Sequence, residues 1–254
     1  MKVLLFGASR GCGLESAVQL VEAGHSVTLF LRDPSKLDAR LSSDKINSGL
    51  VATVKGDAFN DEDVRAAFKS VDGGPDMVIT SIGGTPVMSG LSLRLEPPKI
   101  CERAVDILLP IMKESVQKRG KPIRLTVLSS SGLGKIGHQE LPLPMKPLYS
   151  WVLKEPHADK EQLELKVYHA AGLKHPDASI EANTKPEPTA EPWLSEFILV
   201  RPALLTDGAR KGIYRADEHL KAWTISRADV GHFVATECIK PATQWLNKPV
   251  TIGY

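Results

Sequence analysis

The stretch "KVLLFGASRGCG", residues 2–13, leads from a short apolar run into a turn with three glycines and an arginine. A continuous apolar run of this length predicts a strand that is buried on both faces. Apolar residues then recur at helical spacing, at Leu14, Ala17, Val18 and Val21. The chain therefore begins with a strand, a glycine turn and a helix.

The same alternation of apolar runs and helical patterns continues along the chain. Strands are predicted at 26–32, 50–57, 77–84, 124–132, 197–202 and 249–253, and helices at 60–71, 97–120, 157–171 and 228–239. Strands separated by helices pair in parallel through right-handed crossovers. We therefore expect an α/β fold: one doubly wound parallel sheet of the Rossmann type with a small C-terminal substrate-side region, a single domain over residues 1–254.

One polar segment, residues 172–193, interrupts this rhythm with four prolines. A short turn from helix to strand is expected at that place, so the segment is predicted to be a surface insertion. It could act as a lid, but a mobile surface loop is the favoured interpretation.

The composition restricts the class of partner. The chain has 32 basic and 30 acidic residues, a net charge of +2, and no long block of like charge. This balance argues against nucleic acid or an anionic membrane and favours a small-molecule substrate. The seven histidines lack metal-ligand spacing, so no metal is expected. We expect a monomer or a weak homodimer.

Cysteine usage and the apolar runs suggest a compartment. The three cysteines are far apart and odd in number, which fits a reducing environment better than a disulfide framework. The N-terminal apolar run is too short for a signal sequence, and no stretch approaches the ~18 apolar residues of a membrane span. A cytoplasmic protein is therefore expected.

The glycine turn predicts a dinucleotide site. Gly7, Gly11 and Gly13 are spaced G-x-x-x-G-x-G directly after the first strand. Glycines at this place let the backbone approach a pyrophosphate, and the following helix directs its N-terminal amides at that charge. A turn that merely joined a strand to a helix would not need three glycines.

The end of the second strand indicates which dinucleotide is bound. An acidic residue there binds the 2′-hydroxyl of NAD, whereas an arginine accommodates the 2′-phosphate of NADP. The strand ends in Arg32, which Arg10 of the glycine turn can support, so NADP is favoured. Asp33 keeps NAD open. Asp57, at the end of the third strand, is expected near the adenine or as the cap of a turn.

Motifs along the chain resemble the short-chain dehydrogenase/reductase superfamily: "GASRGCG", "LRDPSKL", "GDAFNDEDV", the Gly83-Gly84 pair and "VLSSSG". The later segments "ILVRPALLTDG" and "TISRADVGHFV" resemble its atypical members, the NmrA-like proteins and the flavin reductase/biliverdin-IXβ reductase group. The resemblance covers nearly the whole chain except residues 172–193. Motifs and resemblance together predict the NADP contacts Gly7, Ser9, Arg10, Gly11, Cys12, Gly13, Arg32, Asp57, Ala58, Ile82, Gly83, Gly84, Lys160 and Pro202.

The catalytic pattern departs from that of the superfamily. Archetypal members use a tyrosine, a lysine four residues later and a serine after the fifth strand. Here Leu153 follows Tyr149 at that spacing, and Lys154 comes one residue too late. Lys160 lies where NmrA-like chains often carry their lysine, which implies that it touches the cofactor ribose.

The proton donor stays open at this point. Tyr149, His157, His138 and a water molecule are candidates, although Tyr149 and His157 could equally be packed or exposed without a role. We rank Ser130 and Ser131 ahead of them, because a hydroxyl at the carboxyl end of the fifth strand faces the nicotinamide in this fold.

A proline-rich loop, residues 138–151, is apolar enough to form a wall of the substrate pocket. Met145 and Trp151 are its candidate lining residues. Apolar loop residues are more often simply packed, so this remains one of two interpretations.

The sequence supports two main functions. The first is an NADPH-dependent reductase that transfers hydride to a small flat or carbonyl-bearing acceptor. The second is a non-catalytic NADP-binding redox sensor of the NmrA-like type, which the missing tyrosine and lysine pair would fit. An epimerase or isomerase with retained NADP is a weaker third possibility.

Overall fold

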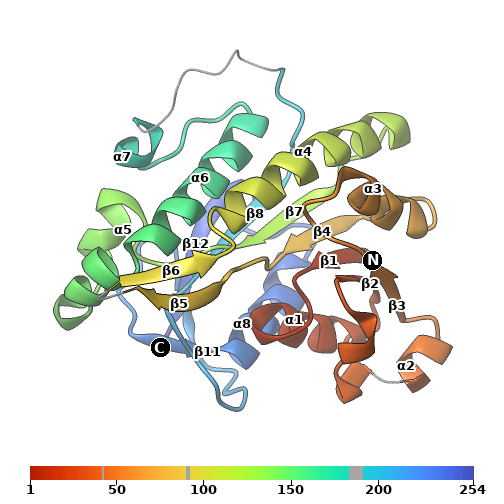
Figure 1. Ribbon diagram of the computed structural model, residues 1–254, viewed down its shortest axis with the longest axis horizontal. Coiled ribbons are helices and arrows are strands. Elements are labelled where there is room, and N and C mark those ends of the chain that lie inside the picture. Colours follow the sequence, from red (N-terminus) through yellow and green to blue (C-terminus); the bar gives the residue numbers. More distant parts are fainter. Residues whose placement is uncertain (42, 90–91, 183–190) are drawn as a thin grey trace.

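Eight strands form the central sheet of the protein (Figure 1). They are β1 (Lys2–Phe6), β2 (Ser26–Leu31), β3 (Val51–Lys55), β4 (Met77–Thr80), β7 (Arg124–Leu128), β8 (Phe197–Pro202), β10 (Arg215–Asp217) and β12 (Lys248–Gly253). Their order is β10-β12-β8-β7-β4-β1-β2-β3, and only the β10–β12 pair of this sheet is antiparallel. The computed structural model describes residues 1–41, 43–89, 92–182 and 191–254.

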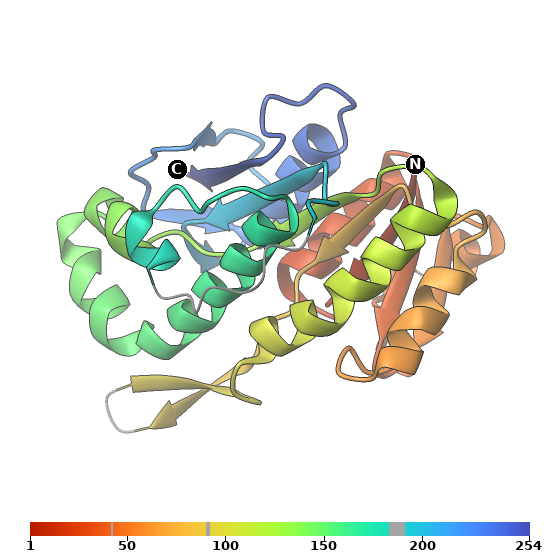
Figure 2. The same ribbon diagram turned by 90° about the horizontal axis from the view of Figure 1, so that it is seen from above.

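Helices cover both faces of the sheet (Figure 2). Val3 and Leu5 of β1 pack with α1 (Gly11–Glu22) and α8 (Arg227–Phe233). Leu4 and Phe6 point to the opposite face and pack with α3 (Asp61–Ser70), α4 (Ile100–Arg119) and α6 (Lys154–Ala170). Successive side chains of a strand point to opposite faces, so the continuous apolar run of β1 serves two cores. The predicted doubly wound fold is confirmed.

Shorter elements complete the architecture. The remaining helices are α2 (Ser43–Asn47), α5 (Gly134–Glu140) and α7 (Ala178–Glu181). Single helical turns occur at η1 (Pro34–Lys36), η2 (Ala39–Leu41), η3 (Leu143–Met145), η4 (Leu148–Val152) and η5 (Val234–Cys238). β9 (Leu204–Thr206) and β11 (Thr224–Ser226) form a small parallel pair. Within the described residues, no helix has both the length and the apolar character needed to cross a membrane.

A hairpin that the sequence analysis did not predict follows β4. Its strands are β5 (Thr85–Ser89) and β6 (Ser92–Glu96), and it projects from the body of the protein beside α6 (Figure 2). An ion pair of 3.5 Å between Arg94 and Glu155 links it to the start of α6. Two strands are shorter than predicted. β4 stops at Thr80 rather than at residue 84, and β7 stops at Leu128 rather than at residue 132.

The predicted surface insertion is partly packed into the protein. In its described part, His175 and Ile180 are buried, and Asp177 caps α7 through the backbone amide of Ser179. Residues 183–190 of the predicted insertion lie outside the described residues. A polar, proline-containing segment is thus held inside by its hydrogen bonds rather than by apolar periodicity.

The glycine turn requires the absence of side chains at two positions. A Cβ atom on Gly13 would lie 2.3 Å from the carbonyl oxygen of Gly7, and one on Gly7 would lie 2.6 Å from that of Ser81. Gly7 also has a φ of +82°, which favours glycine. The turn therefore packs backbone directly against backbone.

We predict that Gly13→Ala destabilises the protein by about 1–3 kcal/mol, because the added methyl group overpacks the turn. Gly208→Ala is the matched control, since a Cβ at that exposed position meets nothing within 4 Å. Urea unfolding followed by circular dichroism measures both. Equal unfolding midpoints for the two variants would contradict the backbone contact.

Candidate functional site

A cavity of about 680 Å³ opens at the carboxyl ends of β1, β2, β3, β4 and β7. Thirteen of the fourteen residues predicted to contact the cofactor line it: Gly7, Ser9, Arg10, Gly11, Cys12, Arg32, Asp57, Ala58, Ile82, Gly83, Gly84, Lys160 and Pro202. The fourteenth, Gly13, lies against the backbone of the turn. The cavity extends from the end of β2 to the end of β7. It is long because two other strands, β1 and β4, lie between these two in the sheet.

The middle of the cavity suits an anion. Gly7 and Gly11 both have positive φ, and the turn they form leads into the N-terminus of α1, a helix of 12 residues. The amides at a helix N-terminus carry partial positive charge. The close contact at Gly13 holds those amides at the cavity, so the turn fits the diphosphate of a dinucleotide.

The end of the cavity next to β2 is strongly basic. Arg10, Arg32 and Lys36 all line it. Asp33 lines it too, but its carboxylate accepts hydrogen bonds from the amide and the hydroxyl of Ser35, at 3.2 and 2.6 Å. The Ser35 hydroxyl and then the ammonium of Lys36, which lies 3.3 Å from Oδ2 of Asp33, hold the pKa of Asp33 below its ordinary value. The acidic group that kept NAD open is thus engaged in its own turn.

Asp57 also serves its own turn at the end of β3. Its Oδ1 accepts a hydrogen bond of 3.0 Å from the amide of Phe59, and its own amide donates to Asp63 at 2.8 Å. Phe59 lines the cavity beside it, and the guanidinium of Arg103 lies 4.3 Å from the centre of that ring. A flat aromatic surface therefore borders the basic end.

Lys160 marks the opposite end of the cavity. Its Nζ donates to the carbonyl oxygens of Leu128 at 2.8 Å and Ile82 at 3.2 Å, where β7 and β4 have just ended. Ser129 lines the cavity next to it. The hydroxyl of Ser129 is buried and has no hydrogen-bond partner within the described part of the chain. A buried hydroxyl left without a partner is unfavourable, so this place fits a polar ligand group.

The other predicted catalytic side chains form a layer behind this end and do not line the cavity. The Ser130 hydroxyl lies 3.1 Å from the carbonyl oxygen of Ser131 and 3.4 Å from Nε2 of His157. Ser131 is buried, and so is Tyr149, whose ring centre is 5.1 Å from that of His157. The structure thus brings Ser130, His157 and Tyr149 together outside the cavity that Lys160 lines.

Burial keeps this layer neutral. It lowers the pKa of His157 to about 4, so the imidazole is uncharged near pH 7. It also raises the pKa of Tyr149, which is the opposite of what a tyrosine that donates protons easily requires. His138 makes an exposed contact of 3.4 Å with the hydroxyl of Ser150, and its charge is the second cause of the lowered pKa of His157.

The proline-rich loop does not form a wall of this cavity. Trp151, on η4, is 74% exposed, and Met145, on η3, is half-buried outside the lining. Apolar character alone did not reveal which of these side chains face a pocket.

Buried carboxylates on α6 fix the position of Lys160. Asp159 accepts hydrogen bonds from the amides of Cys101 and Glu102, at 3.0 and 2.9 Å, and so caps the N-terminus of α4. Glu164, one turn after Lys160, is fully buried. Since the buried face of α6 mixes polar and apolar side chains, these polar contacts set how the helix is rotated.

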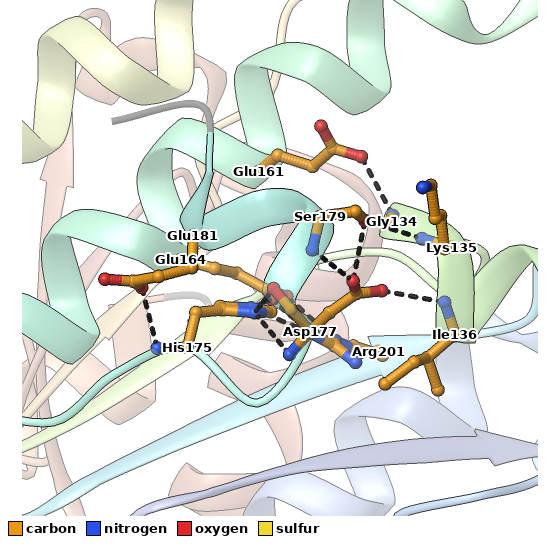
Figure 3. A network of polar contacts seen from close by, with 10 residues as sticks. All are labelled: Gly134, Lys135, Ile136, Glu161, Glu164, His175, Asp177, Ser179, Glu181 and Arg201. Carbon is orange, nitrogen blue, oxygen red and sulfur yellow. Dashed lines mark hydrogen bonds and ion pairs between the residues drawn. The ribbon is translucent and has the colours of Figure 1, made fainter. Parts of the chain in front are cut away.

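Glu164 is the centre of a polar network (Figure 3). It accepts a hydrogen bond of 3.0 Å from Nε of Arg201 and lies 3.1 Å from Nε2 of His175. The same network caps α5, because Glu161, Ser179 and Asp177 accept hydrogen bonds from its first three amides, at residues 134–136. The packed part of the 172–193 segment thus joins α5, α6 and β8.

Thirteen residues beyond the predicted contacts line the cavity, and among them Ser129, Lys36 and Arg227 bring a hydroxyl or a positive charge to it. Ser129 was passed over because β7 was expected to continue beyond it, and a strand end at Leu128 would have identified it. Lys36 lies in the quoted "LRDPSKL" motif, four residues after Arg32. Arg227 follows Ser226, the N-cap of α8, and nothing in the local pattern signals that it faces the glycine turn.

We predict that stability falls in acid through Glu164. Burial alone would raise its pKa, but the guanidinium of Arg201 outweighs this and holds the pKa at about 2. A carboxyl with a lowered pKa stabilises the fold above its unfolded pKa of ~4.3, and this stability is lost as the pH falls towards the folded value. Glu164→Gln should therefore lower the free energy of unfolding by about 3 kcal/mol at pH 7, since it leaves Arg201 unpaired. Its free energy of unfolding should change less than that of wild type between pH 6 and pH 3.

Urea unfolding at the two pH values measures this effect. Glu191→Gln, at an exposed position, is the matched control and should follow wild type. The double variant Glu164→Leu/Arg201→Met should recover much of the loss, because it removes both charges. A single variant as stable as wild type would show that the pair does not hold α6.

Comparison with known proteins identifies relatives that match along the chain. The family described as NAD(P)H-binding matches residues 7–167. Reductase pytE of Aspergillus terreus is 30% identical over 274 residues, which cover 99% of this chain and 97% of that protein. Oxidase pynE of Aspergillus niger is 26% identical over 293 residues, which cover 98% of this chain and 97% of that protein.

A solved structure shares the fold. ChuY, an anaerobilin reductase from Escherichia coli O157:H7, superposes with a TM-score of 0.64 over 100% of this chain and 97% of its own. The two sequences are 19% identical, so this likeness concerns the fold alone.

Proposed function

The chain belongs to the family of NAD(P)H-binding proteins, among the atypical short-chain dehydrogenase/reductases, and we propose that it is a reductase that takes NADPH as its hydride donor. An NAD(P)-dependent oxidoreductase is supported by the family match and by two relatives whose names state redox activities, a reductase and an oxidase. That the cofactor is NADPH rather than NADH, and that the hydride passes from the cofactor to the substrate, is what we propose in addition.

The observation that carries the proposal is the single cavity that joins the glycine turn to Lys160 and Ser129. A nicotinamide dinucleotide supplies a hydride, and its diphosphate must be held while its two ends are placed apart. The turn provides amides for the diphosphate, and Lys160 and Ser129 provide polar groups at the far end. The residues present therefore fit this cofactor.

NADPH is proposed over NADH because of the charges at the β2 end. Arg10, Arg32 and Lys36 line the cavity there, and guanidinium groups bind phosphate through paired hydrogen bonds. Asp33, the group that would favour NADH, accepts hydrogen bonds from Ser35 instead. A 2′-phosphate would meet three basic side chains, while the two carboxylates of this end, Asp33 and Asp57, accept hydrogen bonds from their own turns.

We keep Ser130, Ser131, Tyr149 and Lys160 as proposed catalytic residues, and we rank Lys160 first and Ser130 second. Lys160 lies on the cavity, where the family resemblance implies a contact with the ribose. Ser130 is half-buried, follows Ser129 directly in the sequence and adjoins His157. Tyr149 and Ser131 are buried more deeply.

The alternative function is a non-catalytic NADP-binding redox sensor. The neutral layer of Ser130, His157 and Tyr149 favours this reading, because none of the three lines the cavity. A sensor would bind NADPH and reduce nothing. An epimerase or isomerase would retain NADP and show no net consumption of NADPH.

We predict that the purified protein binds NADPH and oxidises it in the presence of a small flat or carbonyl-bearing acceptor. Calorimetry measures the binding, and the fall in NADPH absorbance measures the reaction with a panel of flavins, quinones and small carbonyl compounds. Ser130→Ala should lower kcat roughly tenfold or more with unchanged NADPH affinity, since it removes a donor to the developing negative charge.

Two variants complete this experiment. Ser131→Ala reports on the buried neighbour, and Ser150→Ala, at an exposed position, is the control that should keep full turnover. Tight NADPH binding without oxidation of any acceptor would overturn the reductase and favour the sensor. Full turnover in both Ser130→Ala and Ser131→Ala would exclude serine from the mechanism.

We predict that Arg32→Ala weakens NADPH binding at least tenfold, roughly the loss of one charge-assisted hydrogen bond, and leaves NADH binding almost unchanged. Arg40→Ala is the matched control, because Arg40 pairs with Glu15 and Asp38 outside the cavity lining. Calorimetric titration with both cofactors gives the comparison. Equal losses for NADPH and NADH would contradict the assignment of Arg32 to the 2′-phosphate.

A further inference from the structure

Arg227 brings a cation to the glycine turn from the opposite end of the sequence. It is the first residue of α8 and lines the same cavity as the turn. Its Cδ and Nε atoms lie 3.8 Å from the position that a Cβ on Gly11 would occupy. The side chain therefore covers the turn at the place where Gly11 leaves the backbone bare.

The positive charge of Arg227 acts on Cys12, a residue of the turn. Burial raises the pKa of the Cys12 thiol to about 12, and the positive charge of Arg227 is the largest effect that opposes this rise. Lys160 opposes it as well, from the other end of the cavity. The first residues of α1 thus lie between cations from two distant segments.

The present partner of Arg227 is weakly bound. Nη1 of Arg227 donates to Oδ1 of Asp207 at 2.6 Å, but the side chain of Asp207 is 90% exposed and that of Arg227 is 31% exposed. An ion pair with so exposed a carboxylate contributes little, because water screens it and two long side chains must be held still. Such a partner is easily exchanged for an anion with more charge.

The backbone that carries Arg227 is held firmly. Ser226 caps α8 through the amide of Asp229, and the Asp229 carboxylate accepts a hydrogen bond from the Ser226 hydroxyl at 2.9 Å. The same carboxylate accepts from the amides of Lys211 and Gly212, at 3.1 and 2.8 Å. The exchange of partners therefore requires movement of the Arg227 side chain only, without rearrangement of the 207–214 loop.

We propose that Arg227 binds the diphosphate of the dinucleotide and that Asp207 holds this side chain when no diphosphate is present. The guanidinium lies over the turn whose amides face the diphosphate, so the anion is bound from two sides. Asp207 then acts as a competitor that the cofactor displaces. This inference rests on the proposed cofactor site and does not depend on hydride transfer.

The proposed roles of Arg227 and Arg32 can be told apart by the ligands whose binding each arginine affects. NADPH, NADH and ADP all contain a diphosphate, whereas NADPH alone of the three carries the 2′-phosphate. Arg227 should therefore contribute to all three ligands, and Arg32 to NADPH only. This difference separates the two arginines experimentally.

Calorimetric titration of the full chain with NADPH, NADH and ADP tests the proposal. Arg227→Ala should weaken binding of each ligand about tenfold, roughly the loss of one charge-assisted hydrogen bond. Arg227→Lys should retain part of the affinity, since it keeps the charge and loses the paired donors. Asp207→Asn should tighten binding of all three ligands severalfold by removing the competitor.

Arg210→Ala is the matched control. Arg210 contacts Gln19 at 3.2 Å and does not line the cavity, so this variant should bind all three ligands as wild type does. Circular dichroism establishes that each variant is folded.

Three results would overturn the proposal. Unchanged binding of ADP and NADH to Arg227→Ala would remove Arg227 from the diphosphate. A raised KM for the acceptor with unchanged affinity for NADPH would assign Arg227 to the substrate instead. A wild-type chain that binds none of the ligands would overturn the cofactor site together with this inference, whereas binding without turnover would overturn only the reductase.

Discussion

Two buried carboxylates on α6, Asp159 and Glu164, fix the geometry on which the rest of the site depends. Asp159 caps α4, and Glu164 faces Arg201 at the end of β8. A buried carboxylate is unfavourable unless it is paired and hydrogen-bonded, so these contacts disfavour any other rotation of the helix. Lys160 lies between the two carboxylates in the sequence and is thereby delivered to the carbonyl oxygens at the strand ends.

The charged and neutral side chains of this site are arranged differently from those of an archetypal member of the superfamily. The side chains nearest to Ser130 are kept neutral, because burial lowers the pKa of His157 and raises that of Tyr149. The charged side chains that line the cavity are instead five lysines and arginines and two aspartates. A site of this kind can accelerate hydride transfer by holding the reactants in place and stabilising negative charge, with less contribution from a strong acid.

How far the sequence predicted the molecule depended on whether a feature is local. The glycine turn, the alternation of strands and helices, and Arg32 at the end of the second strand follow from patterns within a few residues, and the sheet confirms the fold that they indicated. The packing of His175 was not predictable, because its partner Glu164 lies on another element and both residues are polar. Arg227 was missed for the same reason: it and the turn it covers are separated by most of the chain.

The net charge of +2 conceals a strong local imbalance. Arg10, Arg32, Lys160 and Arg227 reach one cavity from four separate segments, although acidic and basic residues are almost equal in number over the chain. Like charges that line one cavity repel, and the two aspartates of the lining, Asp33 and Asp57, offset this repulsion only in part. An anion bound among them relieves it at several contacts at once. The electrostatic repulsion that the fold tolerates without a ligand therefore becomes part of the free energy with which it binds one.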